Sequence, residues 1–218
     1  MLVRDYMTSD PFTVRPESDY LAAIAILKAA SFRSLPVVDA DGRVVGIVSD
    51  KDLAGVAPTK LTSGDQGRPD YYGVQYKVKQ VMNKDFGIVS PEVPLEEAAL
   101  EMLNKKQDRL LVVENDNLVG IITSTDIFKQ LVTTLGAGSG KTRITTQVDN
   151  SPGQLARLSG AISRVGGNIT SAATSASNEP EKILITFRVE GVDWSVLEDA
   201  IQTGCEAAII HVCGDDCR

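Results

Sequence analysis

Apolar positions in the first part of the chain follow two different spacings. Tyr20, Ala23, Ile24 and Leu27 lie at the i, i+3, i+4, i+7 positions of an amphipathic helix, which we expect to end near Ser31. Two short apolar runs, typical of strands joined by a hairpin turn, follow at residues 35–38 and 44–48. A further helix is expected over residues 49–57. This pattern predicts a unit with the order strand, helix, strand, strand, helix.

The same pattern returns later in the chain, at an offset of 75 residues that falls to 74 after one deletion. Met7 recurs as Met82, and the segment 46–52 recurs as 120–126. A duplicated unit that is too small to bury its own apolar face usually packs against its copy, and the seam between copies is a natural place for a cleft. We therefore expect the functional site at this seam.

A third region has a different element order. Its expected strands and helices run strand, helix, strand, strand, helix, strand, over residues 143–148, 154–165, 168–175, 182–189, 195–203 and 207–212. This order predicts a ferredoxin-like split unit and, with the repeats, a mixed α/β (α+β) chain. We divide the chain into a first repeat (1–57), a connection rich in Gly and Pro (58–77), a second repeat (78–135), a Gly-rich linker (136–141) and a C-terminal domain (142–218).

Charge and composition narrow the class of partner. The net charge is -7, with 15 basic against 19 acidic residues before Lys141 and 7 against 10 from there onward. Nucleic-acid binding leans on lysine and arginine, so a dedicated DNA or RNA binder is not expected, whereas a small phosphorylated ligand is compatible with a local patch. We find neither a membrane span nor a secretory leader, and we expect a cytoplasmic protein that does not insert into a membrane.

Two recurring polar pairs are the strongest candidates for ligand binding. Ser49 with Asp52, and Thr123 with Asp126, each place a hydroxyl and a carboxylate one turn apart at a helix start. A hydroxyl beside first-turn amides suits a phosphate oxygen, and a carboxylate suits the two hydroxyls of a ribose. The alternative is a helix-capping box with no ligand. Recurrence at equivalent places favours a ligand role.

The duplicated unit resembles a pair of CBS domains. The carrying residues are Met7, the strand 35–39 with its Pro-Val-Val-Asp sequence, and the segment 46–52. The second copy departs from the pattern, with Leu111 in place of proline and Glu114 in place of aspartate. The resemblance implies binding of AMP, ADP, ATP or S-adenosylmethionine in the cleft between copies. It also implies the nucleotide-binding residues Thr13, Arg33, Ser49, Asp52, Arg109, Thr123 and Asp126, with the aspartates on ribose and the arginines as anion partners or, alternatively, as solvated surface charges.

The C-terminal region resembles an ACT domain. The carrying residues are the loop 149–153 after the first strand and the segment 167–169 before the second strand. In that family these places receive an amino acid at an interface between paired domains, which implies the candidates Asp149, Asn150, Gly153, Asn168 and Ile169. Helix capping explains part of the loop, and ACT domains also serve as dimerisation units alone.

Catalysis is not expected, because the chain has a single histidine and no nucleophile-base pair emerges. His211, Cys213 and Cys217 are not expected to form a metal site, since no second ligand pair accompanies them; reduced thiols are expected. The order of a CBS pair and an ACT domain resembles bacterial acetoin-utilisation regulatory proteins. From the CBS and ACT resemblances we expect a homodimeric, non-catalytic sensor that acts on a regulated enzyme partner; a structural oligomerisation scaffold with vestigial pockets is the alternative.

Overall fold

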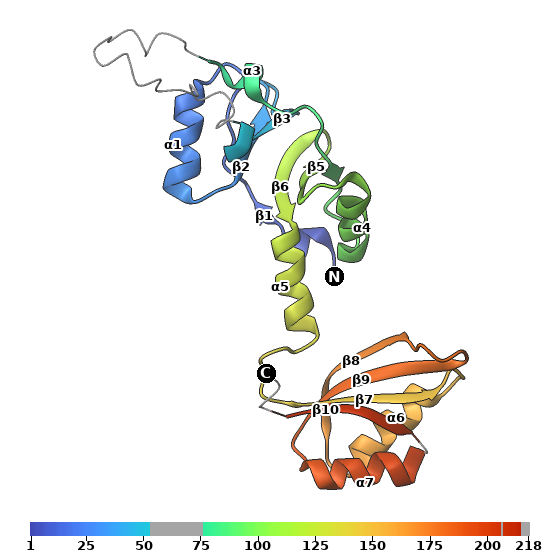
Figure 1. Ribbon diagram of the computed structural model, residues 1–218. Helices are drawn as coiled ribbons and strands as arrows, with labels where there is room; N and C mark the ends of the chain where they lie inside the picture. Colours follow the sequence, from blue (N-terminus) through green and yellow to red (C-terminus); the bar gives the residue numbers. More distant parts are fainter. Residues whose placement is uncertain (53–75, 206, 215–218) are drawn as a thin grey trace, which may run out of the picture. The chain divides into compact units, whose positions relative to one another are not determined.

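The computed structural model describes residues 1–52, 76–205 and 207–214. Two compact units are present, Met1–Phe128 and Lys129–Arg218, and Figure 1 shows their elements. The expected connection 58–77 lies outside the described residues except for Tyr76 and Lys77, and the expected helix 49–57 is described only as far as Asp52. Within the described ranges, no helix combines the length and the apolar character that crossing a membrane requires.

The amphipathic helix and the two hairpin strands that the apolar pattern predicts form in both repeats. The elements of the first repeat are η1 (Val3–Asp5), β1 (Thr8–Ser9), α1 (Tyr20–Ala30), β2 (Ser34–Val38) and β3 (Val44–Ser49). In the second repeat they are α3 (Val78–Val81), β4 (Ile88–Val89), α4 (Leu95–Lys105), β5 (Arg109–Glu114), β6 (Asn117–Thr123) and α5 (Ser124–Thr134), the last of which crosses the division between the two units. Helices α1 and α4 both end at a residue in the left-handed conformation, Ser31 with φ 55° and Lys106 with φ 53°. Residues that are 75 positions apart therefore have the same backbone conformation at the ends of these helices.

The N-terminal segment of each repeat packs in the hydrophobic cluster of the other repeat. Val3 of η1 is fully buried in the hydrophobic cluster of the second repeat, and Val78 of α3 is fully buried in the cluster of the first repeat. Strand β1 pairs antiparallel with β6 of the second repeat, while Ile47 of β3 forms an antiparallel bridge with Asn83. The two repeats therefore complete each other's cores and cannot pack as separate domains.

This exchange explains the methionine and the glycine that recur in the sequence. A Cβ atom on Gly46 would lie 2.7 Å from Sδ of Met82, and a Cβ atom on Gly120 would lie 2.5 Å from Sδ of Met7. Each methionine thus packs on the bare backbone of a glycine in the opposite repeat. A side chain at either glycine would displace the methionine of the partner repeat.

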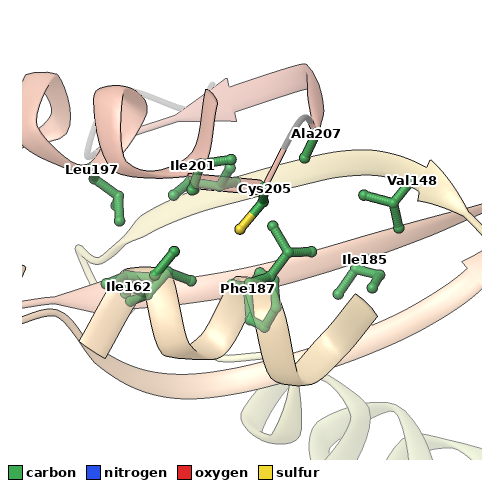
Figure 2. Packing of buried hydrophobic residues seen from close by; sticks show 12 residues of the cluster. Val148, Ile162, Ile185, Phe187, Leu197, Ile201, Cys205 and Ala207 are labelled. Carbon is green, nitrogen blue, oxygen red and sulfur yellow. The ribbon is translucent and has the colours of Figure 1, made fainter. Parts of the chain in front are cut away.

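The second unit has the expected ferredoxin-like element order. Its elements are β7 (Thr142–Asp149), α6 (Gln154–Arg164), β8 (Asn168–Ala176), β9 (Lys182–Glu190), α7 (Trp194–Cys205) and β10 (Ala208–Cys213). The sheet order is β10-β7-β9-β8, with every neighbouring pair antiparallel. Figure 2 shows Ile162 of α6 and Ile201 of α7 packing with Phe187 of β9, so the helices cover one face of the sheet and form the core there.

The glycine-rich segment between α5 and β7 is bound to the sheet of the second unit. Nε of Arg188 donates to the carbonyl oxygen of Leu135 at 2.8 Å, and its Nη1 donates to the carbonyl oxygen of Lys141 at 3.2 Å. The ammonium group of Lys141 lies 2.9 Å from the carboxylate of Glu190. Two residues of β9 therefore hold both ends of the segment.

Candidate functional site

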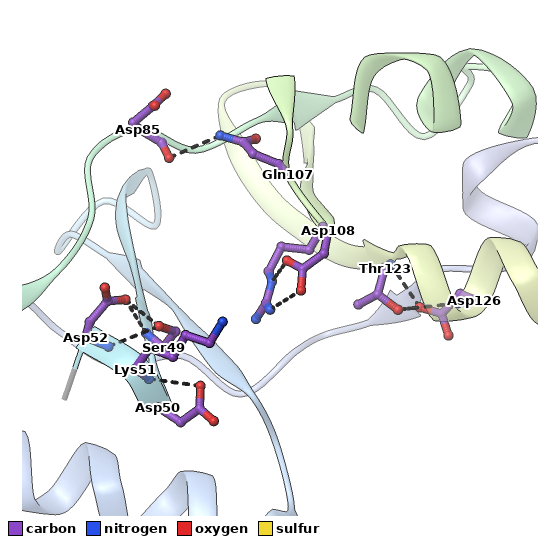
Figure 3. Close-up of polar contacts among 10 residues, drawn as sticks. Ser49, Asp50, Lys51, Asp52, Asp85, Gln107, Asp108, Thr123 and Asp126 are labelled. Atoms are coloured by element: carbon purple, nitrogen blue, oxygen red, sulfur yellow. Dashed lines mark hydrogen bonds and ion pairs between the residues drawn. The ribbon is translucent and has the colours of Figure 1, made fainter. Parts of the chain in front are cut away.

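A cavity of about 760 Å³ lies between the two repeats, at the expected seam. This volume is in the range of small-molecule binding sites. The end of β3, the chain around Asn83 and the turn between α4 and β5 supply its walls, and these segments face one another in Figure 3. Its cationic lining residues are Arg33, Lys51, Lys105, Lys106 and Arg109, and its acidic lining residues are Asp50, Asp52, Asp85 and Asp108.

Ser49 and Asp52 form a reciprocal cap at one wall of this cavity. The hydroxyl of Ser49 donates to Oδ2 of Asp52 at 2.6 Å, and the amide of Ser49 donates to the same oxygen at 2.8 Å. The amide of Asp52 donates back to Oγ of Ser49 at 3.2 Å. Both groups line the cavity. Because Oδ1 of Asp52 accepts no hydrogen bond from any residue that the structure describes, it is available as an acceptor for ligand hydroxyls.

Thr123 and Asp126 repeat this cap almost atom for atom. The hydroxyl of Thr123 donates to Oδ2 of Asp126 at 2.6 Å, and its amide donates to the same oxygen at 2.9 Å. This pair does not line the cavity described above. Capping geometry is thus present at both sites, and only the first of the two is joined to the cavity.

The two predicted arginines lie at the same cavity, and both are close to Asp108. Nε and Nη2 of Arg109 donate to the two carboxylate oxygens of Asp108 at 2.7 Å each. These hydrogen bonds, together with the charge of Arg109 and the nearby charge of Arg33, hold the pKa of Asp108 below its ordinary value. An anion in the cavity would meet both guanidinium groups, and it would compete with Asp108 for Arg109.

The structure does not bring Thr13 to this cavity. Thr13 is exposed and lies next to Val14, which forms a parallel bridge with Val37. Motif reasoning missed Lys51, Lys106 and Gln107, which all line the cavity. Lys106 and Gln107 follow α4, where no motif marks them. A comparison of the two repeats position by position shows that these residues differ in charge and polarity from Ser31 and Phe32.

The five candidates in the second unit fall into two groups. Asp149 lies at the end of β7, where its carboxylate is 2.7 Å from the ammonium group of Lys182. This hydrogen bond and the charge of Lys182 lower the pKa of Asp149. Gly153, with φ 91°, precedes α6, and Asn150 lines a second cavity of about 400 Å³ beside the turn between β8 and β9.

The other group lies at the far end of the sheet. Nδ2 of Asn168 donates to the carboxylate of Glu190 at 2.9 Å, and Ile169 pairs with Val189. Hydrogen bonds from Lys141 and Asn168 lower the pKa of Glu190. Because Asp149 pairs with Lys182 and Asn168 pairs with Glu190, the two groups lie at opposite ends of β9. A single copy of the chain does not bring them together.

Metal ligands do not gather in the described part of the chain. No group of three or more His, Cys, Asp or Glu side chains there could hold a metal ion. His211 lies in β10 and its Nδ1 is 3.2 Å from Nη1 of Arg143. Cys205 is a buried free thiol, whereas Cys213 is disulfide-bonded, which corrects the expectation that all the thiols are reduced.

Comparison with known proteins assigns both units to families. The CBS domain model matches residues 3–58 and 78–133, and the model of the TTHA0829-like ACT domain matches residues 140–213. The CBS domain-containing protein YhcV of Bacillus subtilis (strain 168) is 31% identical over 145 residues, which are 66% of this chain and 96% of that protein.

Two solved structures are similar to this chain in fold and sequence. The acetoin utilization protein AcuB of Vibrio cholerae is 29% identical, with 64% of this chain and 96% of that chain covered and a TM-score of 0.52. CBSX2, which was solved in complex with AMP, is 27% identical, with 61% and 96% covered and a TM-score of 0.51.

Proposed function

Since the chain belongs to the CBS domain family and carries a C-terminal ACT domain, we propose that it is a non-catalytic, cytoplasmic regulatory protein that binds an adenine nucleotide or a related adenosyl ligand between its repeats. Ligand occupancy then biases the packing of the two repeats and is passed on to a partner enzyme. Regulation and ligand binding are the general role of such modules. The adenosyl ligand and the residues that hold it are the proposal.

The observation that carries the proposal is the joining of one cap and two arginines at a single cavity. Oδ1 of Asp52 accepts from the ribose hydroxyls, while Oδ2 stays in the cap with Ser49. Arg33 and Arg109 bind the phosphate. The hydroxyl of Ser49 donates its hydrogen bond to Asp52. Ser49 can therefore donate to a phosphate only if the cap opens. Binding of AMP by CBSX2 supports an adenosyl ligand, because its CBS pair has the same fold.

Isothermal titration of the full chain with AMP, ADP, ATP and S-adenosylmethionine tests this proposal. We expect saturable binding of at least one of the four. Asp52→Asn keeps an acceptor for the cap but removes the charge, and we expect it to weaken binding about tenfold, the value of a charge-assisted hydrogen bond. Asp126→Asn is the matched control, because its cap is the same and it does not line the cavity. Flat traces for all four ligands would overturn the nucleotide proposal.

For the ACT domain we propose that two copies of the chain form a homodimer and that an amino acid binds where the two copies meet. The separation of Asp149, Asn150 and Gly153 from Asn168 and Ile169 within one copy supports this, since a complete site then needs residues from two. Light scattering coupled to size exclusion, with and without a panel of amino acids, tests it. A monomer under all conditions would exclude the shared site.

The second candidate function is an oligomerisation scaffold with vestigial pockets. It is favoured by the caps at Asp52 and Asp126, because the hydrogen bonds within each cap form without any ligand. A scaffold has the same mass and the same melting temperature with and without nucleotide, whereas a sensor is stabilised by its ligand. Thermal unfolding in saturating ATP separates the two functions.

A further inference from the structure

The two repeats place different residues at equivalent positions around the seam. Gly87 and Gln107 line the cavity, and 75 residues earlier the first repeat has Phe12 and Phe32. The positions are equivalent in structure as well. The amide of Phe32 donates to the carbonyl of Leu27 at 2.9 Å, and the amide of Gln107 donates to the carbonyl of the corresponding Met102 at 2.9 Å.

At these positions the first repeat has two aromatic rings, and the second has a glycine and a polar amide. Phe12 and Phe32 are 63% and 39% exposed, and their ring centroids are 5.6 Å apart. In the second repeat, a Cβ atom on Gly87 would lie 2.6 Å from Oε1 of Gln107. That oxygen is buried and accepts no hydrogen bond from any residue that the structure describes. The bare backbone of Gly87 is therefore covered by the side chains of Leu110 and Gln107, at a cavity wall where the first repeat has an aromatic ring.

The cavity also carries three lysines whose equivalents in the other repeat are uncharged. Lys51, Lys105 and Lys106 line the cavity, and the residues at the equivalent positions in the other repeat are Thr125, Ala30 and Ser31. Lys105 is paired with Glu101 at 2.8 Å. The ammonium groups of Lys51 and Lys106 form no ion pair with any residue in the described ranges. Two lysines, one from each repeat, thus lie at the cavity without an ion pair among the described residues, and the carboxylates of Asp50, Asp52 and Asp85 line the same cavity.

We propose that this cavity is the nucleotide site of the chain and that it selects nucleoside di- and triphosphates over the monophosphate and over S-adenosylmethionine. The inference rests on the proposed function and names the ligand class and the half-site. One phosphate is matched by Arg33 and Arg109, and each further phosphate adds negative charge that Lys51 and Lys106 neutralise. A sulfonium group is itself a cation and gains nothing from these side chains.

Titration of the full chain with ATP, AMP and S-adenosylmethionine at physiological salt tests the selectivity. We expect ATP to bind at least about tenfold more tightly than AMP, as two partly solvated charge pairs would provide, and S-adenosylmethionine to bind most weakly. Equal affinities for ATP and AMP, or tighter binding of S-adenosylmethionine, would overturn the inference and leave the proposed function intact. No binding of any of the three would overturn both.

A charge variant with a matched control identifies the side chains. Lys51→Gln/Lys106→Gln should reduce the preference for ATP over AMP to about threefold or less. Arg15→Gln/Lys28→Gln changes the net charge equally at two exposed residues that do not line the cavity, and it should leave the preference unchanged. An equal loss in both variants would show that net charge alone sets the preference, against the inference.

A second pair of variants locates the site. Gln107→Phe gives the cavity wall the residue of the first repeat, and we expect ATP affinity to fall at least about tenfold, because the ring occupies ligand space. Phe32→Gln is the reciprocal change and should leave the affinity unchanged. The opposite result would place the nucleotide in the other half-site. Melting temperatures verify that both variants fold. If Gln107→Phe does not fold, the double variant Lys51→Gln/Lys106→Gln tests whether the nucleotide binds in this cavity.

Discussion

At the scale of single residues, Arg109 has one observed partner, Asp108, and one proposed partner, a phosphate. Its side chain is 18% exposed and forms two hydrogen bonds to Asp108, whose side chain is 60% exposed. The pair lines the cavity in which we place a phosphate. Asp108 therefore orients the guanidinium group and also occupies the donors that a phosphate needs.

We predict that Asp108→Asn raises the affinity for ATP about fivefold. The substitution removes one negative charge from the cavity wall and frees Arg109, which is worth about 1 kcal/mol for a partly solvated pair. Isothermal titration measures the change. Asp116→Asn, at an exposed turn away from the cavity, serves as the control. Unchanged or weaker binding by Asp108→Asn would mean that orientation of Arg109 matters more than competition.

The same pair gives a pH dependence with a defined sign. Because Arg109 lowers the pKa of Asp108 in the folded state, the pair stabilises the fold at pH values above the ordinary carboxyl pKa, and this contribution is lost as the pH falls through the lowered pKa. Solvent screening keeps the effect below about 1 kcal/mol. Urea unfolding at pH 7 and pH 3 should show a smaller acid loss for Asp108→Asn than for the unmodified chain.

Sequence reasoning found some site residues and missed others for physical reasons. Asp52 and Arg109 were predicted, and they lie at the cavity because a motif places them at the ends of strands that meet there. Asp126 has the same motif and does not line this cavity. The motif alone does not distinguish the two repeats, because the packing of the repeats decides which copy lies at the cavity. Lys106 was missed because a residue that ends a helix in the left-handed conformation has no motif of its own.

At the scale of elements, the exchange of N-terminal segments is the feature that the sequence did not predict. Helical spacing and strand runs identify which face of an element is buried, and they do not identify the partner. Strand β1 was not expected to pair with β6, because the pairing spans more than a hundred residues of chain. The repeat marks Met7 and Gly120 as recurring residues, and their contact follows only from the fold.

The contact between Met7 and Gly120 predicts a coupled pair. Gly120→Ala should destabilise the fold by about 1–2 kcal/mol, because its Cβ would meet the methionine sulfur. Met7→Ala removes that obstacle, so the double variant should lose less stability than the sum of the single variants. Urea unfolding of the four proteins in the cycle measures the coupling. Strict additivity would contradict the contact.

The exchange also predicts that core changes in one segment affect the opposite repeat. Val3→Ala and Val78→Ala should each cost about 2 kcal/mol, since both side chains are fully buried. Hydrogen–deuterium exchange should show loss of protection in the second repeat for Val3→Ala and in the first repeat for Val78→Ala. Leu103→Ala, at a side chain that is 74% exposed, is the control. Loss confined to the repeat that carries the substitution would disprove the exchange.

At the scale of the whole molecule, the two units have separate hydrophobic clusters. Those of the first unit come from the interlocked repeats, and that of the second unit comes from α6, α7 and the sheet. The chain's single tryptophan, Trp194, packs on the cluster of the second unit. Its fluorescence therefore reports on that unit alone.

We predict two thermal transitions, of which only one responds to nucleotide. ATP at about one hundred times its dissociation constant should stabilise the first unit by about 2.7 kcal/mol and raise its transition in circular dichroism. The transition seen by Trp194 fluorescence should stay in place. A fluorescence transition that moves together with the other would mean that the two units unfold as one body.

The interlocked repeats also bear on how such a chain arose. In a single repeat on its own, the N-terminal segment with Val3 would have no opposite core to pack in. The glycine at the position of Gly46 would likewise have no methionine packed on it. Two identical chains could fill each other's cores by exchanging these N-terminal segments. Duplication of such a repeat places both exchanging segments in one polypeptide, so that each half is free to differ, as it does at Phe32 and Gln107.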